Sequence, residues 1–129
     1  MDLYVEACMA TRKFRSIEER LNFIEFRQQL LFDNDEISRI LFENQITEAE
    51  YCEIMDLMDD FRAKIDRGEK VHHGSFEQQM YDILPCHKGD NHLCEYIARA
   101  FWEERRWEEV FPALYGGFPK YSHLFENEN

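Results

Sequence analysis

The chain has 129 residues, 44% of them hydrophobic and 15% aromatic, and its formal net charge at pH 7 is −12. This length favours one domain, and this hydrophobic content excludes a disordered chain. The negative charge disfavours direct binding to nucleic acid or to an anionic membrane, because both require concentrated Lys and Arg. No stretch approaches 18 apolar residues and no signal segment is evident, so we expect a soluble, cytoplasmic protein.

The first 15 residues have a mixed composition, and we expect them to form an arm or a short helix. Ser16 and Glu19 then match a capping box, in which a hydroxyl and a carboxylate each accept a hydrogen bond from an otherwise unpaired backbone N–H. The pattern that follows predicts a helix from Ile17 to Phe32. Its predicted core-facing stripe contains Ile17, Leu21, Ile24 and Leu31, widened by Phe23 and Leu30.

Residues 33–36 supply a break and a new N-cap for a short helix that ends near residue 42. A second capping box at Thr47 opens the most strongly patterned helix, expected from Glu48 to Arg67 and closed by Gly68. Acidic residues near its start and basic residues near its end suit the helix dipole. Its predicted buried stripe is Tyr51, Ile54, Met55, Met58, Phe61 and Ile65.

After a loop, Ser75 is predicted to cap a helix that ends before Pro85. Asp90 or Asn91 is expected to cap the next helix, over residues 92–104, and a short last helix follows near residues 107–114. The predicted fold is therefore all-α: a compact bundle of five to six short antiparallel helices spanning residues 16–115. Residues 116–129 form an aromatic tail beyond it.

Several short segments between residues 20 and 111 form a recognisable order. They are Arg20-Leu21, Gln29-Leu30-Leu31, Ile46-Thr47-Glu48-Ala49-Glu50, Gly74-Ser75-Phe76, the pair Glu95 and Ile97, Trp107, and Val110-Phe111. In this order and spacing the chain resembles a family of small, uncharacterised helical proteins of Bacillus and its relatives, the YhaI-like family. The resemblance implies an all-α fold with no assigned activity, and it supplies no catalytic residue.

Histidine and cysteine side chains concentrate between residues 72 and 94. Imidazole and thiolate are the ligands that zinc prefers, although the spacing here fits no standard zinc pattern. Exposed loop histidines with two buried thiols are the alternative interpretation, and a Cys–His nucleophile pair lacks a visible oxyanion-binding turn. The candidate metal ligands are His72, His73, Cys86, His87, His92 and Cys94.

Acidic residues are unevenly distributed. Residues 33–60 contain ten acidic side chains and one basic side chain, so this stretch carries −9 of the net −12. Such a run is either a solubilising outer face or a landing surface for a basic partner. The aromatic tail either packs on its own bundle or crosses to a second copy in a homodimer. The predicted partner-binding residues are Glu43, Glu50, Glu53, Asp56 and Asp60, together with Phe118, Tyr121 and Phe125.

These patterns favour a non-enzymatic protein, without a cofactor, that acts by protein–protein interaction in a regulatory or adaptor role. The expected partner is a protein with a basic surface, and a second copy of the chain is the other candidate. One alternative is a zinc-binding protein that uses the His and Cys residues of 72–94. Another is an inhibitor that mimics the charge of nucleic acid and binds the basic cleft of a nucleic-acid-binding protein.

Overall fold

The computed structural model describes residues 14–125, and over that range the chain is helical without strands. The predicted all-α class is therefore confirmed for this part of the chain. Most of the predicted arm, residues 1–13, lies outside the described residues, as do 126–129. The elements are α2 (Ile17–Asp33), α3 (Glu36–Glu43), α4 (Glu48–Asp66), α5 (His73–Ile83), the 3₁₀ helix η1 (Pro85–His87), α6 (Asn91–Glu103), α7 (Val110–Tyr115) and the 3₁₀ helix η2 (Pro119–Leu124).

Three of the predicted helix starts are capped by the expected residues, with the complete capping box at Thr47 and only its hydroxyl half at Ser16. The Thr47 N–H donates to the Glu50 carboxylate at 2.9 Å, and the Glu50 N–H donates back to the Thr47 hydroxyl at 3.1 Å. The Ser16 hydroxyl accepts from the Glu19 N–H at 3.1 Å, and the α6 cap is Asp90. These interactions form between residues three apart, which is why the sequence alone locates them.

The start of α5 differs from the prediction. The ring Nδ1 of His72 accepts from the Gly74 N–H at 3.0 Å, so the helix begins at His73 and Ser75 lies within its first turn. The Ser75 hydroxyl accepts instead from the Gln79 side chain. An imidazole that precedes the expected cap provides the acceptor first, and the helix starts earlier than predicted.

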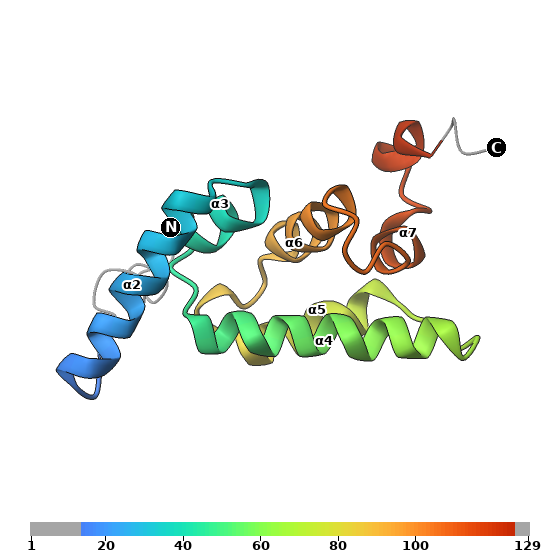
Figure 1. Cartoon of the computed structure of the whole chain (residues 1–129). Coiled ribbons are helices and arrows are strands. Elements are labelled where there is room, and N and C mark those ends of the chain that lie inside the picture. The colour runs from blue at the N-terminus through green and yellow to red at the C-terminus, as the bar shows by residue number, and fades with distance from the viewer. Residues whose placement is uncertain (1–13, 126–129) are drawn as a thin grey trace.

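The longest helix, α4, runs along one side of the molecule with α5 beside it, while α6 and α7 close the other side (Figure 1). Its predicted stripe is confirmed in the main, since Ile54, Met58 and Phe61 are buried and the others half-buried. Aromatic rings from α5, α6 and α7 complete the core, including Phe76, Phe101, Phe111 and Tyr115.

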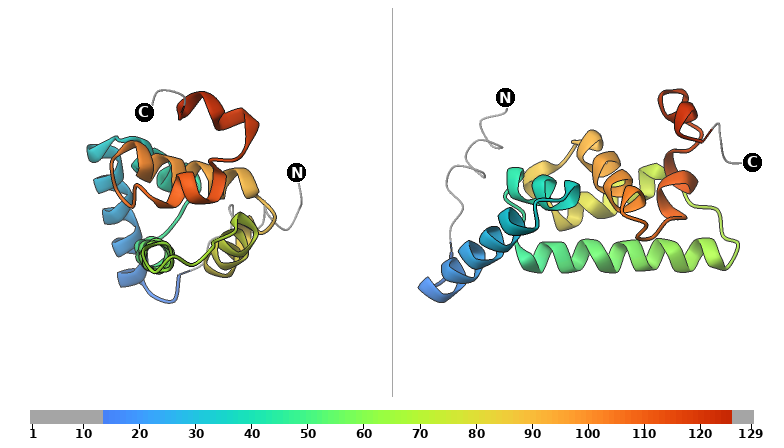
Figure 2. Two further views of the ribbon diagram at one scale, coloured as in Figure 1. Left: turned by 90° about the vertical axis from the view of Figure 1, so that its right-hand side faces the viewer. Right: turned by 45° about the horizontal axis from the view of Figure 1, so that its top comes forward.

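Helix α2 packs chiefly against α3 and projects from one end of the molecule, opposite η2 (Figures 1 and 2). The stripe predicted to face the core is wrong for its four main members, whereas Leu30, one of the two residues expected to widen it, is buried. Its members Ile17, Leu21, Ile24 and Leu31 are between 51% and 78% exposed. The buried side chains are Phe26 and Leu30, on the other side of the helix.

A cationic side chain explains which side of α2 packs inward. The Arg27 guanidinium donates to the Phe42 carbonyl at 2.9 Å and lies 3.8 Å from the centre of the Phe42 ring. A backbone hydrogen bond and a cation–π contact together fix the α2–α3 pair through Arg27. This orientation leaves the apolar stripe pointing away from the body.

The aromatic tail packs on its own chain. Tyr121 is 4% exposed, and Phe118, Leu124 and Phe125 are half-buried against the core. Rings of the tail meet Phe111 at centroid distances of 5.0 Å for Tyr121 and 6.1 Å for Phe125. This packing buries Tyr121 and leaves Phe118 and Phe125 partly exposed, so partner binding by these three residues stays a prediction.

No helix within residues 14–125 combines the length and the apolar character needed to cross a membrane.

Candidate functional site

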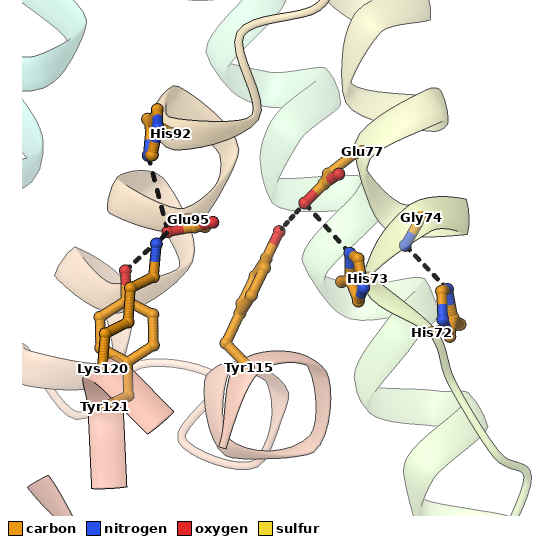
Figure 3. Close-up of polar contacts among 9 residues, drawn as sticks. All are labelled: His72, His73, Gly74, Glu77, His92, Glu95, Tyr115, Lys120 and Tyr121. Atoms are coloured by element: carbon orange, nitrogen blue, oxygen red, sulfur yellow. Dashed lines mark hydrogen bonds and ion pairs between the residues drawn. The ribbon is translucent and has the colours of Figure 1, made fainter. Parts of the chain in front are cut away.

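Two carboxylates lie in the interior, one on α5 and one on α6 (Figure 3). Glu77 is 9% exposed and Glu95 is 1% exposed. Burying a carboxylate is costly unless donors surround it, so the partners of these two residues define what the site does. Neither residue was singled out from the sequence as a candidate site residue.

Glu95 attaches the C-terminal segment to α6. Its carboxylate accepts from the Tyr121 hydroxyl and from the Lys120 ammonium, each at 2.7 Å, and the His92 ring lies 4.0 Å away (Figure 3). Burial, and then the hydrogen bond to Glu95, raises the pKa of Tyr121, so this hydroxyl stays a donor. The Lys120 ammonium thus balances the charge of the carboxylate, and both donors connect η2 to α6.

Glu77 connects α7 to α5 in the same way. The Tyr115 hydroxyl donates to its carboxylate at 2.7 Å, and the His73 Nδ1 atom lies 3.5 Å away (Figure 3). Burial, and then Glu77, raises the pKa of Tyr115 far above its ordinary value. Both buried carboxylates therefore accept hydrogen bonds from tyrosines that follow α6 in the chain.

Cys94 lies beside this network but is not an activated nucleophile. Burial raises the pKa of its thiol to about 12, with further contributions from the charges of Glu77 and Asp90. A reactive cysteine needs the opposite shift, because the thiolate is the attacking species. The contacts of these buried polar groups are therefore better explained as links between segments of the fold than as an acid–base or thiol catalytic site.

The two histidines before and at the start of α5 are engaged locally. His72 caps the helix through Gly74, and His73 points toward Glu77 (Figure 3). Their rings stack on one another at a centroid distance of 4.4 Å. The Phe118 ring meets His73 edge-on at 5.0 Å, so His73 packs against the tail.

The other four candidate ligands are dispersed. His87 bonds through Nε2 to the Asn44 carbonyl at 3.1 Å, whereas His92 is exposed at the start of α6. Cys86 is disulfide-bonded, and Cys94 is buried. Within residues 14–125, no three His, Cys, Asp or Glu side chains gather in a group that could hold a metal ion. The structure therefore does not bring the six predicted ligands together.

The predicted acidic surface divides into two kinds of residue. Glu53, Asp56 and Asp60 are exposed on α4, three and four residues apart, so their carboxylates lie on successive turns of one side. None of the three side chains has a hydrogen bond or an ion pair among residues 14–125. We call these three residues the α4 acidic face.

The other acidic residues have different roles. Glu50 belongs to the Thr47 capping box, so its carboxylate has a role within the fold, and its contact with a partner stays a prediction. Asp59 accepts from the Trp107 indole at 2.7 Å and pairs with Arg62 at 3.2 Å. Glu43 is exposed, but it ends α3 and lies apart from this face in the chain. The surface open to a partner is thus smaller than the sequence indicated.

No model of a known protein family matches this chain, and no curated protein or solved structure matches it either. The resemblance to the YhaI-like family therefore stays a prediction.

Sequence reasoning missed Glu77 and Glu95 because charged residues are rarely buried. A pointer was present for Glu95, which lies between Leu93-Cys94 and Ile97-Ala98 in an otherwise apolar stretch. A lone acid on the apolar side of a helix requires donors from another element. Tyr121 and Lys120, which supply them here, are 25 or more residues away in the chain.

Proposed function

We propose that this protein acts without catalysis, by binding another protein, and that the α4 acidic face contacts a basic surface of that partner. The observation that carries the proposal is the alignment of Glu53, Asp56 and Asp60 on the exposed side of α4, without partners within residues 14–125. Aligned carboxylates of one sign steer a basic partner and fix its orientation.

The surrounding structure supports this role over a metal-dependent or thiol-dependent one. Of the histidines and cysteines considered for such activities, His72 caps a helix, His87 contacts a neighbouring segment, Cys94 is buried and Cys86 is disulfide-bonded. Cys94, with its raised pKa, is a protonated thiol at neutral pH. The exposed surface instead presents the three regularly spaced carboxylates of the α4 acidic face.

The test is a binding experiment with matched charge reversals. The wild-type chain is immobilised and its partners are captured from cell lysate at increasing salt. Replacing Glu53, Asp56 and Asp60 by Lys should abolish capture of the specific partner. Replacing Asp82, Glu108 and Glu109 by Lys changes the net charge equally at exposed positions elsewhere, and it should leave capture intact.

The salt dependence provides the second readout. Capture should weaken as salt rises, because screening shortens the reach of exposed charges. A partner held equally well at about 1 M salt, or after reversal of the α4 acidic face, would contradict the proposal. If the partner binds nucleic acid, competition by nucleic acid distinguishes the charge-mimicking role from an adaptor role.

A further inference from the structure

The exposed apolar stripe of α2 is the second surface that the fold leaves open. Its apolar members are more than half exposed, and Phe32 beside them is 84% exposed. Monomeric proteins rarely display a contiguous apolar patch larger than a few hundred Å², and larger ones usually mark an interaction site. We name the following residues the α2 stripe: Ile17, Leu21, Ile24, Gln28 and Leu31.

The spacing of the α2 stripe is that of the apolar seam between two helices of a coiled coil. Its positions follow one another at intervals of four, three, four and three residues, which are the d and a positions of successive heptads. At 100° per residue, all five lie within an arc of about 80°. Phe26, which packs into the body, lies about 180° from Ile17, so the stripe faces directly away from α3.

The flanks of the stripe carry opposite charges. Arg20 and Arg27 occupy the g positions on one side, and Glu18 and Glu25 occupy the e positions on the other. Neither Arg20 nor Glu25 has an ion pair or a side-chain hydrogen bond within residues 14–125. A parallel pairing of two such helices places each Arg20 opposite the Glu25 of the second copy.

We propose that the occupant of the α2 stripe is a second copy of this chain, with the two α2 helices side by side in a parallel, symmetric pair. An antiparallel pair would set g positions against g positions, so Arg20 would face Arg27 of the other copy. The charge pattern thus favours one orientation. Two-fold pairing is also the commonest form of soluble assembly.

A polar residue inside the seam supports the same register. Gln28 is exposed at the second a position, and in the parallel pair it meets its own counterpart across the axis. A single polar a residue fixes register and the number of strands at some loss of stability. In the antiparallel pair, with Ile24 at the centre, Gln28 would face an apolar neighbour and lack a partner.

Sedimentation velocity over a concentration series tests the proposal with the full chain. The wild type should shift from monomer to dimer as concentration rises. Ile24→Glu should weaken the dimer more than about a hundredfold, because it places two charges in the seam. Ile24 is 51% exposed in the monomer, so circular dichroism should show an unchanged fold. Tyr96→Glu, at an equally exposed aromatic on α6, is the matched control and should leave the dimer unchanged.

Charge exchange tests the orientation. Arg20→Glu and Glu25→Arg should each weaken the dimer about tenfold, and the double variant should restore it. An antiparallel pair gives the opposite sign for Arg20→Glu, because the introduced carboxylate would then face Arg27 of the second copy. Oxidative cross-linking of Leu31→Cys supplies a second measure, since position 31 meets itself only in a parallel pair.

Three outcomes would overturn the proposal. One is a wild-type chain that stays monomeric throughout, which would leave the stripe bare or covered by another segment. Another is a dimer that survives Ile24→Glu, and the third is a dimer strengthened by Arg20→Glu. The result is independent of the proposed function, because charge reversal on the α4 acidic face should not change this dimer.

Discussion

Helices α2 and α6 both begin with a side-chain cap and carry apolar side chains at helical spacing, yet they differ in how much of their apolar surface is covered. α6 is enclosed by α3, α5, α7 and the C-terminal segment, and seven of its residues are buried. α2 has α3 as its chief neighbour and buries two. Periodicity therefore predicts that a helix has an apolar side, whereas the fold decides whether that side has a partner.

Thiol reactivity should give the largest difference between the two helices. A pKa raised from 9.0 to about 12 leaves Cys94 with roughly a thousandfold less thiolate at pH 8. A Leu21→Cys variant, diluted so that monomer dominates, places a thiol in the exposed stripe and should be alkylated quickly. Peptide mapping after iodoacetamide treatment reads each site, with the exposed native Cys52 as internal reference.

The same shift has a consequence for stability at high pH. Because the pKa of Cys94 is higher in the folded state, the buried thiol contributes to the free energy of unfolding. This contribution is fully present below about pH 9 and is lost as the pH rises toward about 12. Tyr81, whose pKa burial raises to about 12, acts in the same direction. Rapid labelling of Cys94 at pH 8 in the folded chain would contradict this, because it would show that the buried side of α6 is open to water.

Truncation of one side chain on each helix tests the packing difference directly. Phe101→Ala should lower the free energy of unfolding by about 3–5 kcal/mol, because a fully buried ring leaves a cavity. Ile24→Ala should lower it by less than about 0.5 kcal/mol in the dilute monomer. Urea denaturation followed by circular dichroism measures both, and equal effects would contradict the exposure of the α2 stripe.

The buried carboxylate of α6 should matter less than its buried ring. Glu95→Ala removes the acceptor of the Tyr121 hydroxyl and should cost about 2 kcal/mol. The Lys120 contact adds little, because that side chain is 47% exposed. Limited proteolysis should then cut the chain near η2 sooner than in the wild type.

A conservative substitution distinguishes loss of the Tyr121–Glu95 hydrogen bond from a general loss of packing. Tyr121→Phe keeps the ring contacts with Phe111 and deletes only the hydroxyl, so it should reproduce much of the loss. Tyr96→Phe makes the same chemical change at an exposed position and should have no measurable effect. A wild-type proteolysis pattern in both Glu95→Ala and Tyr121→Phe would show that this hydrogen bond does not hold η2 on α6.

The sequence predicts the local features of this fold well. The caps at Ser16, Thr47 and Asp90 are right because the interacting atoms are three residues apart. The stripe of α4 is also right, since this helix has one strongly apolar side and packs against two neighbours. The α5 start is wrong because the His72 ring, a less usual cap, precedes Ser75.

Tertiary partners are harder to predict, as the candidate sites show. The sequence places Glu53, Asp56 and Asp60 on the outside correctly, because charge and helical spacing agree. For Glu50 it predicts both a capping box with Thr47 and a place on the partner surface, and the structure confirms the capping box. The periodicity of α2, in contrast, does not reveal that Arg27, beside the stripe, directs the packing.

The caps of the two helices provide the smallest and most local test. Asp90→Ala removes the acceptor for the Leu93 N–H, which lies 3.1 Å from the carboxylate, and should cost about 1 kcal/mol. Ser16→Ala removes an equivalent contact to Glu19. Because the start of α2 has few tertiary contacts, its loss should fray the first turn without lowering global stability in the monomer.

Hydrogen exchange distinguishes these two responses. Asp90→Ala should lower protection throughout the core, in proportion to the global free energy of unfolding, whereas Ser16→Ala should lower it only near residues 17–20. In the proposed dimer the first turn of α2 forms part of the seam, so the Ser16→Ala effect should shrink as protein concentration rises. An effect that is large, global and independent of concentration would mean that α2 is packed as closely as α6.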